Sequence, residues 1–343
     1  MKANKIISSV LSLALLSGAV PPVDVKADGA TSAGFCGDYA VWTLEADGTL
    51  RIKGSGALND YEIQSMRCSI HSGAVTAEWK SDPVPWYEQR SNIKKIVIED
   101  GIISIGKKIF MDCDNLTEVQ LPETLESIGG EAFYHCDKLK EIRIPDSVVN
   151  IYSEAFESCG ALSNVMLSSS LKKIDYHAFR WTNTKEIVIP ESVKEIGVGA
   201  FEEAVHLSEV CVLSRDCDIY PNEVNFSNGY SWQDKANVLN AVIYGWEGST
   251  IQAYAEEFGY GFVSMKYGDV DFDSNINALD ASLVLSEYSS TSTGNDSLLS
   301  NPQKIISDTD LDGNINALDA SYILSYYSHT ATGGEGTFEE FMK

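Results

Sequence analysis

A repeat of about twenty-three residues runs through the middle of the chain, from about residue 93 to residue 212. Phenylalanine recurs at this step, at Phe110, Phe133, Phe156, Phe179 and Phe201. Two aliphatic sets recur with it, namely Leu121, Ile144, Leu167, Ile189 and Val212, and Ile105, Ile128, Ile151, Ile174 and Ile196. A unit this short cannot bury an apolar face alone, so its copies have to stack. The repeat therefore predicts a solenoid in which these residues form one continuous core.

Each unit follows the pattern L-x-x-V-x-L-P-x-x-L-x-x-I-x-x-x-A-F-x-x-C-x-x. Period and pattern are typical of a leucine-rich repeat, so we predict a β-rich solenoid of α/β repeats. One short strand is predicted per unit, at 96–98, 119–121, 142–144, 165–167, 187–189 and 210–212. The unit resembles the repeats of BspA-like bacterial surface proteins, which are commonly adhesins. That resemblance implies a binding role and does not name the ligand.

The segments on either side of the repeats resemble the caps of the same family. Ahead of them, Asp47-Gly48 between alternating apolar residues predicts a hairpin, so we expect a β cap over 34–92. Behind them, 243–263 resembles a closing segment, so the solenoid with its C-terminal cap is expected over 93–264. An insertion at about 214–238 interrupts the last coil. Its Tyr230 and Trp232 suit stacking on a sugar ring, although packing against that coil is the simpler alternative.

One acidic segment near the C-terminus occurs twice, thirty-nine residues apart, and 269–289 and 308–328 are identical at fifteen of twenty-one positions. Carboxylates at loop positions 1, 3, 5 and 12, with a carbonyl at 7, have the spacing of a calcium loop. With an asparagine at position 9, the predicted ligands are Asp269, Asp271, Asp273, Asn275, Asn277 and Asp280, and Asp308, Asp310, Asp312, Asn314, Asn316 and Asp319. Turn propensity alone would explain one copy but not a duplication. The sequence therefore predicts two bound Ca²⁺ ions.

The two loops depart from the usual calcium loop at two positions. Position 12 is aspartate, which reaches less far than glutamate. Position 6 is Gly313 in the second loop but Ser274 in the first, where a left-handed backbone costs strain. We expect the first site to be the weaker one.

No helical pattern leads into either loop, whereas a helix is expected after each, over 279–288 and 318–327. A duplicated loop with only an exiting helix resembles a type I dockerin, and the resemblance covers 266–330. It implies a small all-α calcium-binding module that attaches a secreted protein to a cohesin domain of a scaffold, as in a cellulosome. The positions that meet cohesin in that family correspond to Ala278, Leu279, Leu285, Ser286 and Ser290, and to Ala317, Leu318, Leu324, Ser325 and His329.

These positions imply an apolar contact with the partner. The alternative is that their leucines are core. An inner stripe is already supplied by other residues, namely Ile276, Val284, Tyr288, Ile315, Ile323 and Tyr327. Four of the five contact positions are the same in both halves, which predicts binding in either of two orientations. In the tail, 331–343, we expect Phe338 and Phe341 to pack back onto the module.

Residues 1–27 have the features of a secretory signal peptide. Lys2 and Lys5 precede an apolar run over 6–20, and small residues at 25–27 suit cleavage. The run is too short to span a bilayer, so no membrane insertion is expected. Cleavage removes three lysines and one aspartate and changes the net charge from −25 to −27. This charge excludes nucleic acid and anionic membranes as partners of the secreted product.

Seven cysteines in an exported protein first suggest disulfides. Cys113, Cys136 and Cys159, however, occupy one repeat position, so we predict buried thiols that act as small apolar residues. A zinc site built from them with His135 is the alternative. The state of the remaining four, Cys36, Cys68, Cys211 and Cys217, is left open.

No span remains for a catalytic domain of the usual size. Neither G-x-S-x-G nor H-E-x-x-H occurs in the chain. We therefore expect a non-catalytic protein that presents its solenoid to an unknown protein or polysaccharide ligand, within a complex for polysaccharide breakdown. The alternatives are a carbohydrate-active enzyme of unrecognised type, and a stand-alone adhesin whose duplicated loops only stiffen its C-terminus.

Overall fold

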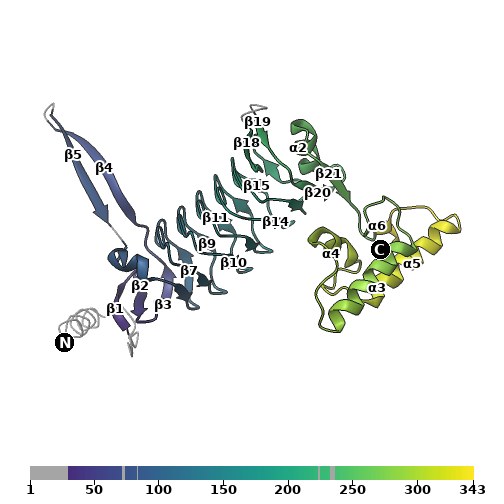
Figure 1. Cartoon of the computed structure of the whole chain (residues 1–343), viewed down its shortest axis with the longest axis horizontal. Helices are drawn as coiled ribbons and strands as arrows, with labels where there is room; N and C mark the ends of the chain where they lie inside the picture. The colour runs from purple at the N-terminus through teal and green to yellow at the C-terminus, as the bar shows by residue number, and fades with distance from the viewer. Residues whose placement is uncertain (1–29, 72–73, 83, 223–224, 232–235) are drawn as a thin grey trace. The chain divides into compact units, whose positions relative to one another are not determined.

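A computed structural model describes residues 30–71, 74–82, 84–222, 225–231 and 236–343 (Figure 1). The predicted signal over 1–27 lies outside these residues, as do Trp232 and the side chain of Tyr230. The chain divides into two compact units. One unit comprises the residues up to 208 together with 217–240, and the other comprises 209–216 and 241–343.

Three antiparallel strands open the first unit, namely β1 (Ala30–Phe35), β2 (Tyr39–Glu45) and β3 (Thr49–Ala57). The predicted hairpin joins β2 to β3, with Gly48 at a φ of 92° and the Asp47 carboxylate accepting from the Thr49 amide at 2.9 Å. Strand β3 then pairs in parallel with both β6 (Lys95–Ile98) and β7 (Ile102–Ile105). The expected β cap is confirmed, and its last strand starts two rows of solenoid strands.

Two further elements belong to this N-terminal region. Strands β4 (Glu62–His71) and β5 (Ala74–Asp82) pair with each other as an antiparallel hairpin. A 3-10 helix, η1 (Tyr87–Asn92), leads from the cap into the first coil.

Each coil contributes two short strands, one to each row (Figure 1). The first row confirms the predicted strands to within one residue and consists of β6, β8 (Glu118–Gln120), β10 (Glu141–Arg143), β12 (Asn164–Met166) and β14 (Glu186–Ile189). The second row was not predicted as strands. It follows the recurring isoleucines and consists of β7, β9 (Ser127–Ile128), β11 (Asn150–Ile151), β13 (Lys173–Ile174), β15 (Glu195–Ile196) and β17 (Asp218–Ile219).

The recurring phenylalanines stack in one column through the core. Successive rings from Phe110 to Phe201 are 5.1 to 5.3 Å apart between centroids, and all are fully buried. Trp86 stacks on Phe110 at 5.9 Å and Phe226 stacks on Phe201 at 5.4 Å. Because Phe226 and β17 both continue the repeat, the first part of the expected insertion forms a further coil of the solenoid. A hairpin of β18 (Gly229–Ser231) and β19 (Ala236–Val238) follows it.

Non-glycine residues with a left-handed backbone recur at the turns of the coils. Glu131 and His135 both have a φ of 56°, for example. Their amides donate to carbonyls of the next coil, to Ser153 and Glu157, both at 3.0 Å. These bonds offset the backbone strain, because the amides would otherwise lack partners. Because these bonds join equivalent turns of successive coils, they also place the side chains of those turns next to one another.

The repeating cysteines are fully buried free thiols, as predicted. The Cys136 thiol donates to the Phe110 carbonyl at 3.4 Å, and the Cys159 thiol donates to that of Phe133 at 3.1 Å. His135 instead has a half-exposed side chain stacked on Tyr134, so the structure does not bring it to these thiols. Cys36 and Cys211 are also buried free thiols, and the buried Cys217 thiol donates to the Asp218 carbonyl at 3.8 Å. The side chain of Cys68 is outside the described residues.

The second unit begins with a parallel β arrangement. Strand β20 (Val242–Trp246) lies between β16 (Glu209–Val212) and β21 (Phe262–Met265), and helix α2 (Thr250–Phe258) connects β20 to β21. Helix α2 ends at Gly259, whose left-handed φ of 70° closes the turn. The expected closing segment is thus a β-α-β unit.

The rest of the second unit is helical. Helices α3 (Ala278–Ser292) and α5 (Ala317–Ala331) follow the two acidic loops, as predicted. A shorter helix, α4 (Asn301–Ser307), leads into the second loop, and α6 (Phe338–Phe341) lies in the tail. The expectation that no helix precedes either loop is therefore wrong for the second. Its start signals were present, because Ser300 and Gln303 form a capping box and Pro302 lies in the first turn.

A small core holds these helices together. It consists of Val270, Ala281, Val284, Leu299, Ala320, Ile323 and Phe338. In the described part of the chain, no helix has the length and apolarity that a membrane span requires.

Candidate calcium loops and partner face

The two exit helices are started by the acidic loops themselves. Asn277 caps α3 by accepting from the Leu279 amide at 2.8 Å, and the Asp280 carboxylate accepts from the Asn277 amide at 2.8 Å. The same two bonds recur at α5, with the same lengths, between Asn316, Leu318 and Asp319. Positions 9 and 12 of each loop therefore form a capping box, which stiffens the junction of loop and helix.

The carboxylates of the first loop turn inward and organise its backbone. Asp269 is almost fully buried and accepts from the Ser274 amide at 3.1 Å. Asp271 accepts from the Asp273 amide at 3.1 Å, and Asp273 accepts from the Asn275 amide at 2.7 Å. Oxygens of Asp269, Asp271 and Asp273 lie within 4.8 Å of one another. Three of the four predicted carboxylate ligands are thus gathered at one point.

The second loop is organised in the same way, but a different set of three carboxylates lies closest together. Asp308 accepts from the amides of Asp312 and Gly313, at 3.1 and 3.0 Å. Here the oxygens that lie within 4.8 Å of one another belong to Asp308, Asp310 and Asp319. Position 12 therefore joins the group in this loop. In the first loop Asp280 is fully buried, and its Oδ1 accepts from the Val270 amide at 2.7 Å.

The predicted ligands at positions 7 and 9 are occupied by local bonds. The carbonyl of Asn275 accepts from the side-chain amide of Asn277 at 3.2 Å, and Asn314 and Asn316 repeat this bond. Since the Asn277 oxygen also caps α3, its side chain is placed to hold the loop.

The loops concentrate negative charge in a buried setting. Burial, with the nearby Asp280 carboxylate, raises the pKa of Asp269 to about 6. Burial also raises the pKa of Asp280 and Asp308. Lys304 is the only lysine or arginine in the sequence between 267 and 330. Crowded oxygen ligands with little compensating positive charge fit a hard divalent cation such as Ca²⁺.

Both loops use left-handed backbone at positions 4 and 6. Phe272 and Leu311 have φ values of 58° and 61°, and Ser274 and Gly313 have values of 72° and 84°. The predicted strain at Ser274 is therefore present in the structure, whereas Gly313 adopts the same conformation freely.

The predicted partner positions lie on the outside of α3 and α5. Leu279 is 55% exposed and Leu285 42%, and their counterparts Leu318 and Leu324 are 46% and 43% exposed. These four leucines are therefore not core residues. The inner stripe differs from the expected one in one respect, because Tyr288 and Tyr327 are also exposed, at 42% and 44%. Each lies one helical turn beyond the last core residue of its helix, Val284 in α3 and Ile323 in α5.

The serines of this face bond to their own helices or to the following loop. Ser286 donates to the Ser282 carbonyl at 2.8 Å, and Ser325 donates to that of Ser321 at 2.7 Å. Ser290 donates to the Asp296 carbonyl at 2.9 Å. His329, which replaces serine in the second half, stacks on Phe341 of the tail at 5.3 Å. The two halves therefore match at four positions and differ where the tail touches the second.

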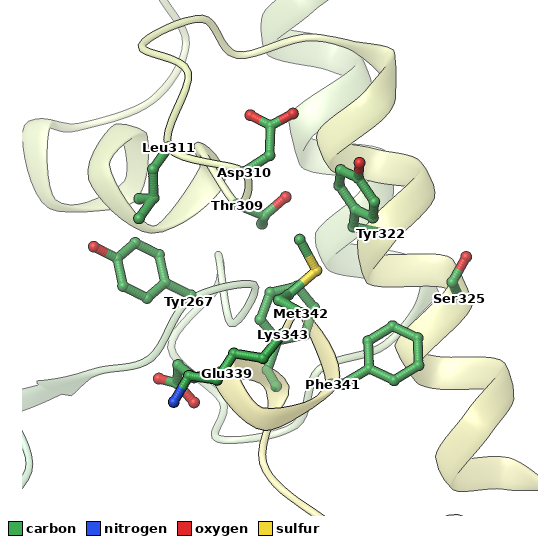
Figure 2. Close-up of a pocket in the computed structure, with 11 residues that line it drawn as sticks. Tyr267, Thr309, Asp310, Leu311, Tyr322, Ser325, Glu339, Phe341, Met342 and Lys343 are labelled. Atoms are coloured by element: carbon green, nitrogen blue, oxygen red, sulfur yellow. The ribbon is translucent and has the colours of Figure 1, made fainter.

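The tail packs onto the module, as expected, and encloses a cavity of about 670 Å³ with the second loop (Figure 2). Figure 2 shows Thr309, Asp310 and Leu311 on one side, Tyr322 and Ser325 of α5 on another, and Phe341 and Met342 of the tail below. Phe338 is buried in the module core. Sequence reasoning found the two phenylalanines but not the cavity, because Tyr267 and Tyr322 on its lining carry no pattern of their own.

Comparison with known proteins accounts for both parts of the chain. The BspA type leucine rich repeat region matches residues 86–208 in six copies, and the dockerin type I domain matches residues 267–327. Type I dockerins bind calcium and imply a cohesin partner. The search of curated proteins finds no match.

Solved bacterial leucine-rich-repeat structures are similar to part of the chain. A leucine-rich repeat protein from Eubacterium ventriosum is 26% identical over 52% of this chain and 43% of its own, with a TM-score of 0.40. A leucine rich cell surface protein from Faecalibacterium prausnitzii is 25% identical over 52% of this chain and 54% of its own, with a TM-score of 0.32. The chain thus spans about half the length of these two proteins. The T. pallidum leucine-rich repeat protein is 21% identical over 64% of this chain and 94% of its own, with a TM-score of 0.37.

The repeat pattern, the stacked coils and the family matches agree with one another. Residues 86–208 are a BspA-type leucine-rich-repeat region and residues 267–327 are a type I dockerin domain, and both are binding modules rather than catalytic domains.

Proposed function

We propose that this protein is secreted, binds a scaffold cohesin through its calcium-loaded dockerin, and presents the repeat region to a protein or polysaccharide ligand. It acts without catalysis, outside the cell, in a cellulosome-like complex for polysaccharide breakdown that is free or attached to the cell surface. The observation that carries the proposal is the duplicated loop-helix unit with exposed leucines on both exit helices. The predicted signal over 1–27 supports export.

Each loop holds one Ca²⁺ ion in this proposal. In the first loop Asp269, Asp271, Asp273 and Asp280 supply carboxylates and Asn275 its carbonyl. The equivalent residues of the second loop are Asp308, Asp310, Asp312, Asp319 and Asn314. The carboxylates repel one another until a cation neutralises them, so calcium stabilises the folded module by binding it in preference to the unfolded chain.

The exposed leucines then provide the energy of docking. Apolar anchors at the centre of an interface carry most of the binding free energy. Leu279 and Leu285, or Leu318 and Leu324, are suited to be these anchors, with Ala278 or Ala317 allowing close approach. The near identity of the two halves supports two alternative orientations on one cohesin.

The test is capture of scaffold proteins from the secreted and surface fraction of the source organism, using the mature full-length chain. The wild type is compared with a double variant, Leu279→Glu and Leu318→Glu, each with calcium and with chelator. The matched control is Leu298→Glu, because Leu298 is also an exposed leucine, at 63%, but lies between α3 and α4 and is not one of the predicted partner positions.

Capture of a cohesin-bearing scaffold by wild type and by the Leu298 variant, only with calcium, supports the proposal. Equal capture by all three proteins regardless of calcium overturns it and favours a stand-alone adhesin. Hydrolysis of polysaccharide by the purified wild type would instead favour an enzyme.

A further inference from the structure

A cluster of ionisable side chains lies at the turns of three neighbouring coils, in the first unit and far from the acidic loops in sequence. It contains Glu154, Glu157, His177, Arg180 and Glu202. Glu154 and His177 occupy the same position of successive coils, and both have a left-handed backbone, with φ values of 61° and 52°. Glu157, Arg180 and Glu202 occupy the position three residues later. Stacking of the coils therefore brings the five side chains together.

His177 is the centre of the cluster and is held in one orientation. The residue is 8% exposed, and its ring stacks on Tyr176 with centroids 3.6 Å apart. Nε2 lies 3.0 Å from Oε2 of Glu202. At the next coil the equivalent position is Gly199, where a Cβ atom would overlap the His177 ring and lie 3.0 Å from Glu202 Oε2. The glycine therefore makes room for this pair.

The second ring nitrogen of His177 faces a buried carboxylate without a bond. Because Nε2 is the ring nitrogen beside the Glu202 carboxylate, it is the one placed to carry the proton of a neutral imidazole and to donate a hydrogen bond. The lone pair of Nδ1 then lies 4.0 Å from Oε2 of Glu157. Within the described part of the chain, no residue donates a hydrogen bond to Nδ1 or to the Glu157 carboxylate. Two electron-rich groups thus face each other in a buried place.

The cluster also has uncompensated negative charge. Its three carboxylates stand against one guanidinium, since Arg180 approaches Glu202 at 3.0 Å and Oε1 of Glu157 at 3.7 Å. The neighbouring Glu131 adds a fourth carboxylate, and Lys107 and Lys108 add two ammonium groups, at 3.6 and 3.3 Å from it. Because both lysines also act electrostatically on Glu154, four carboxylates stand against three cationic groups, and the net negative charge that remains favours a bound cation.

We propose that Glu154, Glu157 and His177 form a zinc site that links two coils of the solenoid. Ligand atoms of the three residues lie within 4.8 Å of one another, so small side-chain rotations bring them to the 2.0–2.2 Å bonds that zinc requires. One imidazole with carboxylates suits Zn²⁺ better than Ca²⁺. Glu202 behind the ring is the carboxylate partner that metal-binding histidines usually have. A water molecule completes the tetrahedron.

The test measures zinc binding to the mature full-length protein with saturating calcium, so that the acidic loops are filled. Equilibrium dialysis is expected to give one zinc per wild-type chain. His177→Gln is expected to weaken this binding at least 100-fold, and Glu202→Gln about 10–100-fold. X-ray absorption of the bound zinc is expected to show one imidazole among oxygen ligands. Zinc is also expected to raise the melting temperature of wild type but not of the His177 variant.

His135→Gln is the matched control, because His135 also stacks on a tyrosine and lies near a carboxylate, that of Asp112 at 3.8 Å, but is exposed. It is expected to leave zinc binding unchanged. Equal zinc binding by wild type and the His177 variant, or no zinc retained by wild type, overturns the site. Should His177→Gln unfold, as judged by circular dichroism, the half-buried Glu154→Gln serves in its place. Its loss of zinc with an intact fold supports the site, and unchanged binding refutes it.

Discussion

The ring of Phe338 in the tail meets the edge of Tyr326 on α5, with centroids 5.2 Å apart and ring planes at 83°. Through this contact the last residues of the chain complete the dockerin core, where Phe338 is only 2% exposed. The tail is therefore part of the module rather than an appendage.

Phe338→Ala is expected to destabilise the dockerin by about 3–5 kcal/mol, because it leaves a cavity in a small core. Calorimetry of the calcium-loaded full-length protein would show the dockerin transition lowered or lost and the solenoid transition unchanged. Phe341→Ala is the control, since Phe341 is 37% exposed and makes only ring contacts with Tyr326 and His329. It should cost about 1 kcal/mol. If the dockerin melted at the same temperature in both variants, the tail would not complete the core.

The periodic parts of this fold were predictable from the sequence because one residue pattern is repeated in every coil. Phe133 and Phe156 each fill the same position, so a single prediction about burial is tested many times. The second row of strands escaped prediction because each strand is only two residues long in most coils, as at Ser127–Ile128, and two residues show no alternation.

The clustering of carboxylates in the acidic loops was also predictable, because a calcium loop places them at fixed spacings within twelve residues. The cluster around His177 was not. Its members come from different coils, and their spacing of about twenty-three residues marks them only as repeat positions. Only the stacking of the coils shows that His177 faces buried carboxylates.

Ser274→Gly is expected to strengthen calcium binding at the first loop about two- to fivefold. The serine has a left-handed φ of 72°, and glycine removes about 1–2 kcal/mol of strain, partly offset by the greater freedom of the calcium-free loop. Gly313→Ser is the reciprocal change and should weaken the second loop by a similar factor. Calorimetric titration with calcium measures both. Unchanged or weaker binding in Ser274→Gly, or unchanged or stronger binding in Gly313→Ser, would contradict the strain argument.

The buried thiols are expected to resist alkylation in the native protein. Burial raises the pKa of Cys36 and Cys211 to about 12, so at pH 8 only about one thiol in ten thousand is the reactive thiolate. In urea the pKa returns to about 8.5 and both should react within minutes. Mass spectrometry after iodoacetamide treatment, with and without urea and without reductant, identifies the modified residues. Fast native labelling would show that these thiols are accessible, and labelling in urea only after reduction would reveal a disulfide.

If either exit helix can dock on cohesin, single and double substitutions should have very different effects on the affinity for cohesin. Ala278→Glu alone, or Ala317→Glu alone, should leave cohesin binding within a few fold of wild type, because the undamaged half still docks. The double variant should lose at least 100-fold in affinity, because a charge is then buried in both orientations. Calorimetry with an isolated cohesin measures all three, and circular dichroism confirms that calcium still folds them.

The tail makes the two docking faces unequal, which allows a further test of the two orientations. His329 contacts Phe341, whereas its counterpart Ser290 bonds only to the loop after its own helix, so the two faces are not identical at their edges. Any preference between the orientations should therefore change when Phe341 is replaced by alanine. If Ala317→Glu alone abolished binding in the Phe341→Ala background as well as in wild type, the module would have one docking orientation and the duplication would serve only to bind calcium.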